Sequence, residues 1–281
     1  MSVARTHTHV VIPDTQIEPG DPVDHMRWIG QYIVDQFADK PDIHIVHLGD
    51  HAAMRSLSVH DSPQEAEGRT YDDDIAAANK AWGMLNAPLV KFNAKRRKYK
   101  ERQWVLGSRH ILLGNHEDHI TRAVAENPKL KDTLRLDHLY YERSGWRVVP
   151  FLEVLGLHGI SYSHFFVNNA NGRAISGMIE TRIKTIGCTF IQGHQQGLKT
   201  GMVETTAGRR RGIVSGSCYL KAEQYRGPQA AGEWRGILIL HEVGDGDFDL
   251  MEVSLAYLAK RYEGVTIDKF LDRKYGIEWV A

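Results

Sequence analysis

The sequence predicts a single α/β (α+β) domain over residues 1–281. Two short runs rich in β-branched residues, 8–12 and 43–48, flank a segment with helical spacing of its apolar residues, 26–37. Strand, helix and strand in this order join parallel strands. After Gly145 the pattern changes to short strand-like runs, which predicts further strands, the last of them antiparallel.

The first strand–helix–strand unit ends each of its strands at an aspartate. Residues 8–12 form a buried strand that enters a loop at Asp14. The next helix has Asp24 as its expected N-cap and stops before Pro41. Its buried face is expected to consist of Met26, Ile29, Ile33 and Phe37. Residues 43–48 form the second strand, after which Gly49-Asp50 turns the chain.

A long helical insertion around 71–102 follows, in which Pro88 indicates a break or a restart. A third strand, 111–113, leads into Gly114-Asn115-His116-Glu117. The remaining elements are predicted from short periodic runs: helices at 118–126, 128–139, 173–184 and 255–262, and strands at 146–155, 159–164, 188–192, 212–215 and 236–243.

The charge balance excludes a protein that is basic or acidic overall. Lys and Arg total 35, and so do Asp and Glu, so no net field attracts nucleic acid or an anionic membrane. The chain begins without the apolar run of a signal peptide, and no apolar stretch approaches the ~20 residues that span a bilayer. A cytoplasmic protein without membrane contact is expected. The basic stretch 91–102 could bind a nucleic-acid backbone, although such runs are usually solvated helix faces.

Five strand-to-loop transitions each deliver a potential metal ligand: Asp14, Asp50, Asn115, His164 and His194. One such coincidence means little, because Asp, Asn and Gly are ordinary turn residues. Five in succession are more informative, since carboxylate, amide and imidazole donors together suit divalent first-row metals. His158 and His241 lie in β-like stretches without a partner motif that would make either a ligand.

This set of motifs resembles the calcineurin-like metallophosphoesterases, and the length and motif order resemble their small microbial and phage-encoded members. The family pattern is D-x-H, G-D, G-N-H-E/D, a lone His and G-H-x-H. The corresponding segments here are Asp14-Thr15-Gln16, Gly49-Asp50, Gly114-Asn115-His116-Glu117, His164 and Gly193-His194-Gln195-Gln196. The resemblance implies a four-layer sandwich of two mixed β-sheets flanked by helices. It also implies a binuclear metal site and phosphoester hydrolysis by a metal-activated hydroxide.

The resemblance further implies a role for each matched residue. One metal would be held by Asp50, Asn115, His164 and His194, and the other by Asp14, Gln16, Asp50 and Gln196. His116 and the bridging Asp50 would be the catalytic residues, with His116 protonating the leaving oxygen. Substrate would be contacted by His116 and Asn115. His51 is a further candidate for substrate contact, because it follows Asp50 directly.

Two departures from the family pattern fall on the same metal. Gln16 and Gln196 stand where the family has histidines. Amide oxygens are harder and weaker donors than imidazole, so Mn²⁺ is the expected ion, ahead of Mg²⁺, Ca²⁺, Fe or Zn²⁺. We expect the second site to bind its metal weakly; the alternative is a chain with one metal or without catalysis.

The expected function is hydrolysis of phosphodiester bonds, and also of monoesters, with nucleotides or nucleic acid as the favoured substrates. One alternative is a phosphatase for protein or small-molecule phosphates. The other is an inactive binding module with the same fold. The sequence leaves the leaving group and the oligomeric state open.

Overall fold

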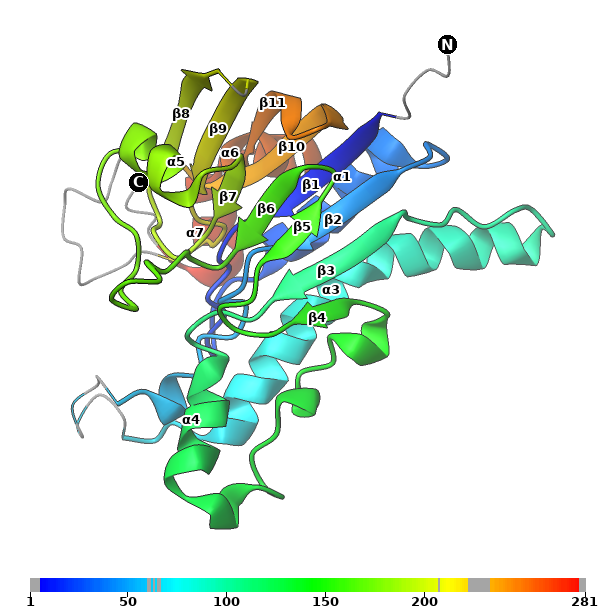
Figure 1. Ribbon diagram of the computed structural model, residues 1–281. Coiled ribbons are helices and arrows are strands. Elements are labelled where there is room, and N and C mark those ends of the chain that lie inside the picture. Colours follow the sequence, from blue (N-terminus) through cyan, green and yellow to red (C-terminus); the bar gives the residue numbers. More distant parts are fainter. Residues whose placement is uncertain are drawn as a thin grey trace.

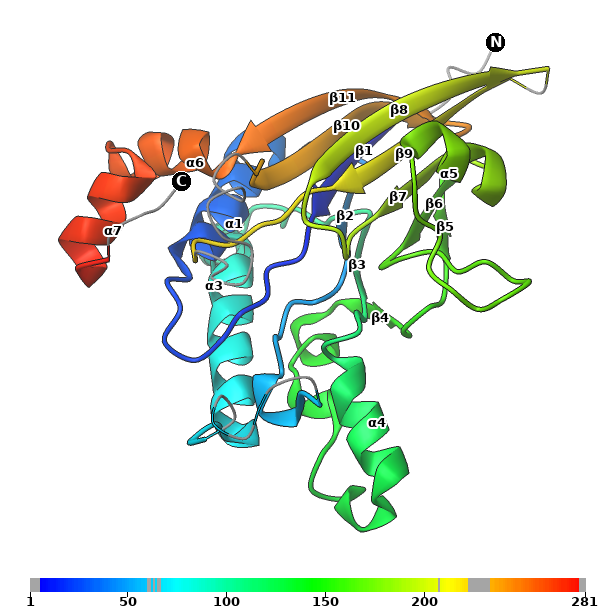
Figure 2. The same ribbon diagram turned by 90° about the vertical axis from the view of Figure 1, so that its left-hand side faces the viewer.

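The computed structural model describes residues 6–59, 62, 64, 67–206, 208–221 and 233–277. Its strands form two mixed sheets, one six-stranded and one five-stranded, that stack face to face between layers of helices (Figures 1 and 2). The predicted sandwich of two mixed sheets flanked by helices is therefore confirmed.

The six-stranded sheet has the order β11-β10-β1-β2-β3-β4. Four neighbouring strands run parallel: β1 (His7–Ile12), β2 (Ile43–His47), β3 (Ser108–Leu112) and β4 (Arg147–Val149). The antiparallel pair β10 (Gly236–Gly244) and β11 (Asp247–Ser254) extends the sheet beside β1. The carboxyl ends of β1, β2 and β3 consequently meet at one edge.

The five-stranded sheet has the order β5-β6-β7-β9-β8. Its strands are β5 (Leu155–Leu157), β6 (Ile160–Ser163), β7 (Phe190–Gln192), β8 (Leu198–Thr205) and β9 (Gly208–Ser215). β6, β7 and β9 run parallel, while β5 and β8 pair antiparallel at the edges. The predicted antiparallel strand 212–215 is thus part of a longer strand with one parallel and one antiparallel neighbour.

Successive side chains of a strand point to opposite faces of the sheet, so the core has one part between the two sheets and another between a sheet and its helices. Val11 packs between the two sheets, while Val10 and Ile12 on the same strand face the helices. The helices on that outer face are α1 (Asp24–Phe37), α3 (Tyr71–Lys98), α6 (Leu255–Glu263) and α7 (Ile267–Tyr275). On the other outer face, α5 (Ile179–Ile186) packs on Phe190 and Val214 (Figure 2). The central parallel strands β2 and β7 are buried on both faces, as such strands require.

The predicted break at Pro88 is wrong, because α3 runs without interruption from Tyr71 to Lys98. Pro88 lies where α3 crosses α1 at Gly30. A Cβ at Gly30 would lie 2.1 Å from the carbonyl oxygen of Leu85 and 3.1 Å from Cδ of Pro88. This close packing of α3 against α1 offsets the hydrogen bond that proline removes.

Several other boundaries differ from the prediction. Residues 128–139 form two short 3₁₀ turns, Pro128–Leu130 and Leu136–His138, rather than a helix, and α4 spans Asp118–Glu126 as expected. The helix predicted from 173 begins at Ile179. Asp24 is the first residue of α1 rather than its cap, and its carboxylate accepts hydrogen bonds from Lys274 and Tyr275 of α7. Helix α7 itself was not predicted. Within the described residues, no helix combines the length and apolarity needed to cross a bilayer.

Buried neutral histidines make stability depend on pH. Burial lowers the pKa of His25 in α1 from 6.5 to about 3. Above pH 6.5 neither the folded nor the unfolded chain protonates this ring; between pH 6.5 and 3 the unfolded chain binds a proton that the folded chain does not. The free energy of unfolding should therefore fall as the pH drops through this window. Urea titrations at pH 7.5 and 4.5 should show a smaller loss for His25→Met than for the parent chain, and an equal loss would contradict the assignment.

Candidate metal centre

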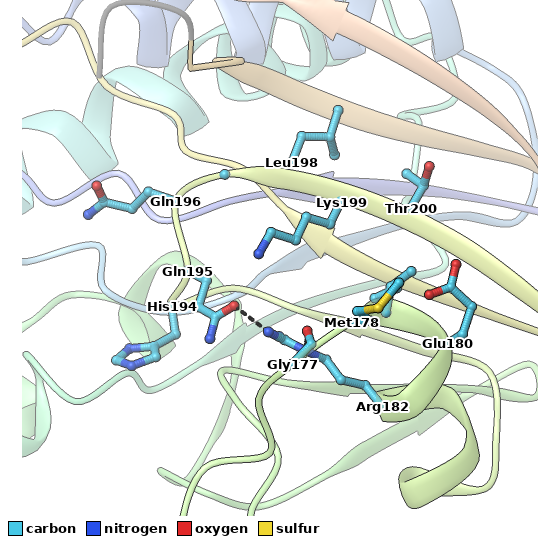
Figure 3. A pocket seen from close by; sticks show the side chains of 12 residues that line it. Gly177, Met178, Glu180, Arg182, His194, Gln195, Gln196, Leu198, Lys199 and Thr200 are labelled. Carbon is cyan, nitrogen blue, oxygen red and sulfur yellow. Dashed lines mark hydrogen bonds between the residues drawn. The ribbon is translucent and has the colours of Figure 1, made fainter. Parts of the chain in front are cut away.

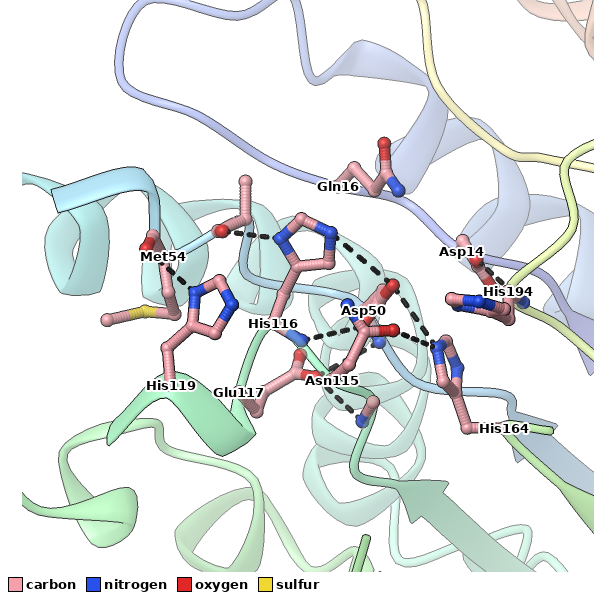
Figure 4. Close-up of polar contacts among 12 residues, drawn as sticks. Asp14, Gln16, Asp50, Met54, Asn115, His116, Glu117, His119, His164 and His194 are labelled. Atoms are coloured by element: carbon pink, nitrogen blue, oxygen red, sulfur yellow. Dashed lines mark hydrogen bonds and ion pairs between the residues drawn. The ribbon is translucent and has the colours of Figure 1, made fainter. Parts of the chain in front are cut away.

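The five predicted ligands converge at the carboxyl edge of both sheets (Figure 4). Asp14, Asp50 and Asn115 follow β1, β2 and β3 of the first sheet, and His164 and His194 follow β6 and β7 of the second. Parallel strands end at the same edge, so the topology alone brings these loops together. Gln16, Asp50 and His194 have φ values of 41°, 47° and 64°. Left-handed backbone at such residues is typical of functional sites, where the surrounding structure must hold it.

Asp50, His164 and His194 form the centre of the group. One ligand atom from each lies within 4.8 Å of the other two, which is a separation that one metal ion can bridge. Oδ2 of Asp50 lies 3.2 Å from Nε2 of His164. Asp50 and His164 are buried, and their positions are consequently set by the protein rather than by solvent.

His164 is oriented as a metal ligand would be. Its Nδ1 donates to the carbonyl oxygen of Leu48 at 2.9 Å, which turns Nε2 toward the centre. There Nε2 lies 3.0 Å from Oδ1 of Asn115 in addition to the Asp50 contact. A ring nitrogen and two acceptor oxygens around one point form a mixed N/O donor set, and an outer hydrogen bond to Nδ1 is what metal-bound histidines usually have.

Asp14 supplies a second buried carboxylate with a spare oxygen. Its Oδ2 accepts a hydrogen bond from the backbone N–H of His194 at 2.9 Å, while its buried Oδ1 has no hydrogen-bond partner among the described residues. A Cβ at Gly193 would lie 2.3 Å from that Oδ1, and one at Gly114 would lie 2.0 Å from Oδ1 of Asp50. The two motif glycines are therefore required by the closeness of the carboxylates, and an orphaned buried oxygen fits a cation ligand.

The pKa values indicate that the site requires positive charge. Burial raises the pKa of Asp14 well above its ordinary value, and the nearby Asp50 adds to the shift. Burial would do the same to Asp50, but the facing rings of His164 and His116 outweigh it and lower the pKa of Asp50. Burial opposes the charge on His164, yet Asp50 raises its pKa to about 10. Two carboxylates in a dry site are stabilised by a cation, so the residues present fit a divalent metal.

Glu117 organises the loops and was not identified as a site residue from the sequence. Its buried carboxylate accepts hydrogen bonds from four backbone N–H groups, those of Asp50, His51, Ala52 and Gly114, at 2.7–3.0 Å. The hydroxyl of Tyr141 donates to it as well. Glu117 thus ties the loop after β2 to the loop after β3. Its place in the Gly-Asn-His-Glu motif was the available signal.

His116 lies at the open side of the centre, with 21% of its side chain exposed. Its backbone N–H donates to Oδ1 of Asp50 at 3.0 Å, and its Nδ1 donates to the carbonyl oxygen of Ala53 at 2.7 Å. Nε2 then points toward Oδ2 of Asp50, 3.7 Å away. The imidazole is held in one orientation next to the candidate ligands.

Both glutamines of interest lie beside the centre and are buried. The backbone N–H of Gln16 donates to the carbonyl oxygen of Asp50 at 2.7 Å, which fixes the loop after β1 against the loop after β2. Figure 4 draws the Gln16 side chain outside the group of Asp50, His164 and His194. Oε1 of Gln196 accepts a hydrogen bond from the Tyr219 hydroxyl at 2.7 Å.

The structure does not support a substrate contact for His51. This side chain is completely buried, its Nε2 donates to the carbonyl oxygen of Ala78 at 3.0 Å, and its Nδ1 accepts from the Thr15 hydroxyl at 2.8 Å. The ring packs against Trp82 and Tyr141 behind the loop. The sequence could not show this, because adjacency to Asp50 does not determine which way a side chain points.

A cavity of about 1200 Å³ opens next to His194 (Figure 3). Helix α5, the loop after β7 and strand β8 line it. Lys199 contributes an exposed amine, and the guanidinium of Arg182 donates to Oε1 of Gln195 at 2.8 Å. The predicted basic stretch lies elsewhere, since the carboxyl end of α3 is beside the start of β3, at the far end of the sheet (Figure 1).

Two comparisons with known proteins identified no relative of this chain. No family model matches the chain, and a search of curated proteins found no match. The buried Asp and His side chains, which lie within metal-binding distance of one another, are therefore the basis for a functional assignment.

Proposed function

We propose that this chain is a metal-dependent phosphoesterase that hydrolyses phosphodiester bonds, with nucleotides or nucleic acid as its substrate class. The proposal is supported above all by the convergence of Asp50, His164 and His194, from three strand ends in two sheets, within metal-binding distance of one another. The spare oxygen of Asp14 beside them supports a binuclear site. The likeness of these motifs to the calcineurin-like metallophosphoesterases adds to the proposal and does not carry it.

The residues would hold two cations, for which Mn²⁺ is the best candidate. Asp50, Asn115, His164 and His194 would hold the first, and the second would be held by Asp14, Gln16, Asp50 and Gln196. When bound, two such cations supply Lewis acidity that polarises a phosphoryl group and makes water a stronger acid. Oxygen donors dominate the second set, which favours Mn²⁺, Mg²⁺ or Ca²⁺ there.

The protein's own groups would orient the substrate and move a proton. The Nδ1 bond to Ala53 leaves Nε2 of His116, which lies 3.7 Å from Oδ2 of Asp50, as the nitrogen that would protonate a leaving oxygen next to the centre. An alkoxide is a poor leaving group, so a diester benefits most from this proton. Lys199 and Arg182 in the neighbouring cavity provide positive charge for the flanking part of an anionic substrate.

The proposal is tested with His116→Gln. Loss of a general acid should lower turnover of a dinucleotide, whose leaving group is an alkoxide, by roughly 10²–10⁴-fold. The metal content should stay constant, because His116 is not among the proposed ligands. The loss should be much smaller for bis-nitrophenyl phosphate, whose leaving group is more acidic. His241→Gln, a half-buried histidine on β10, is the matched control and should keep full activity.

Three outcomes separate the rival functions. Hydrolysis of nitrophenyl phosphate alone would identify a phosphatase for monoesters. Preference for single-stranded DNA or cyclic nucleotides over monoesters would support the proposal. A parent chain that binds Mn²⁺ but turns over no substrate would be a binding module.

The second cation is tested by restoring the family's ligands. Gln16→His with Gln196→His should tighten the weaker of two Mn²⁺ sites by about 10-fold or more, since imidazole is the stronger donor. Metal content at increasing Mn²⁺, measured by elemental analysis, reports the change. A stoichiometry that never exceeds one per chain in either protein would refute the binuclear version and leave the first site intact.

A further inference from the structure

A cluster of histidines lies between the two sheets at the end opposite the candidate metal centre. His7 and His9 are at the start of β1, His44 is at the start of β2, and His158 is in the turn between β5 and β6. His9 and His44 are register partners, and His44 is in turn paired with Ser108 of β3. These side chains alternate with the helix-facing residues of the strands, so they point toward the second sheet.

Three of these rings are spaced as metal ligands are. One nitrogen each from His7, His44 and His158 lies within 4.8 Å of the other two. Nδ1 of His7 and Nε2 of His44 are 3.2 Å apart. Two nitrogens at 2.0–2.1 Å from a tetrahedral zinc ion are separated by about 3.4 Å, so this pair already has nearly the separation that one ion imposes.

The remaining nitrogens of these rings are held by neighbouring groups. Nδ1 of His44 bonds to the Ser108 hydroxyl at 2.8 Å, so the other nitrogen, Nε2, faces Nδ1 of His7 and shares a hydrogen bond with it. Nδ1 of His158 bonds to Nε2 of His9 at 2.8 Å, and Nδ1 of His9 bonds to the Tyr162 hydroxyl at 2.6 Å. Such outer hydrogen bonds orient metal-ligating histidines and select their tautomers.

The backbone leaves room for the central ring. A Cβ at Gly107 would lie 2.5 Å from Cε1 and 2.8 Å from Nε2 of His44. Any other residue at position 107 would displace this ring. The His44 ring is buried, whereas His7 and His158 are half-buried, so an ion can reach the cluster from solvent.

The carboxylate of Asp42 acts electrostatically on His44 and His158, so negative charge also faces the cluster. A nearby carboxylate favours a bound cation.

We propose that His7, His44 and His158 form a separate site for Zn²⁺, or for another first-row dication that prefers imidazole, with water as the fourth ligand. Three nitrogen donors distinguish it from the oxygen-rich centre at the other end of the sheet. The rings of His7 and His158 are stacked, with centroids 3.4 Å apart. Two parallel rings cannot both direct a lone pair at one ion, so coordination turns the His7 ring out of this stack.

The site is tested with Zn²⁺ and Co²⁺ on the full chain. His158→Gln and, separately, His7→Gln should each weaken one Zn²⁺ equivalent by at least about 100-fold and abolish the visible absorption of tetrahedral Co²⁺. His241→Gln, the matched control, should retain both signals. His194→Gln should also retain the Co²⁺ absorption while it loses the other centre, which keeps failure of this site distinct from failure of the proposed function.

Unchanged Zn²⁺ affinity in both His7→Gln and His158→Gln would overturn the proposal. A second measurement leaves His7, His44 and His158 in place. X-ray absorption of the His194→Gln protein, loaded with one equivalent of Zn²⁺, should show mainly nitrogen ligands. A first shell composed mostly of oxygen would equally overturn it.

Discussion

Asp50→Asn is expected to remove metal binding and phosphodiesterase activity together. Asp50 is the carboxylate that both proposed cations would share, and it is buried beside His164. Loss of its charge leaves Asp14 as the remaining carboxylate among the proposed ligands. If the cations stabilise the transition state by several kcal/mol, the activity should fall by roughly 10³-fold or more.

The measurement for Asp50→Asn combines metal content with turnover. Elemental analysis after dialysis against Mn²⁺ should show a loss of bound metal, and bis-nitrophenyl phosphate reports turnover. Asp249→Asn, an exposed aspartate on β11, makes the same chemical change away from the site and should alter neither quantity. Full metal content in Asp50→Asn would remove Asp50 from the ligand set.

Glu117→Gln is expected to lower the stability of the fold, because it disturbs several buried hydrogen bonds at once. Four backbone N–H groups converge on the Glu117 carboxylate in the interior. A glutamine would place an NH₂ group against some of these donors and leave buried groups without acceptors. We expect a loss of about 3 kcal/mol in the free energy of unfolding, which lowers the melting temperature by on the order of 10 °C.

The control for Glu117→Gln is Glu126→Gln, at the exposed end of α4. Thermal melts followed by circular dichroism should show little change for the control. Mn²⁺ affinity should also fall in Glu117→Gln, because the loops after β2 and β3 lose their common acceptor. An unchanged melting temperature would show that the backbone donors find other partners.

Strand ends were predictable from the sequence because polar residues after β-branched runs must enter loops. Asp14, Asp50 and Asn115 were placed correctly at the end of parallel strands for that reason. Pro88 was misjudged because a local rule for helices was overridden by the packing of α3 on Gly30. Helix α7 was missed because its apolar face is short and its partner, α1, lies far away in sequence.

The candidate site shows the same division between local and long-range information. The ligand types could be predicted from motifs, but the acceptor role of Glu117 requires the geometry of two loops. His51 follows Asp50 directly, and still its ring is directed into the core. The cluster of His7, His44 and His158 was not predicted, since its members come from three elements without a common motif. Contacts between distant segments are determined by topology, which a single sequence reveals only in part.

Two hydrogen bonds near the centre join one sheet to the other. Nδ1 of His164 reaches Leu48 at the end of β2, and the N–H of His194 reaches Asp14 at the end of β1. These bonds hold the two sheets together at this edge. A small shift of one sheet relative to the other would therefore separate the proposed ligands. Substitutions in the apolar core between the two sheets, for example at Ile191, should therefore alter metal affinity and turnover, although this side chain is not among the proposed ligands.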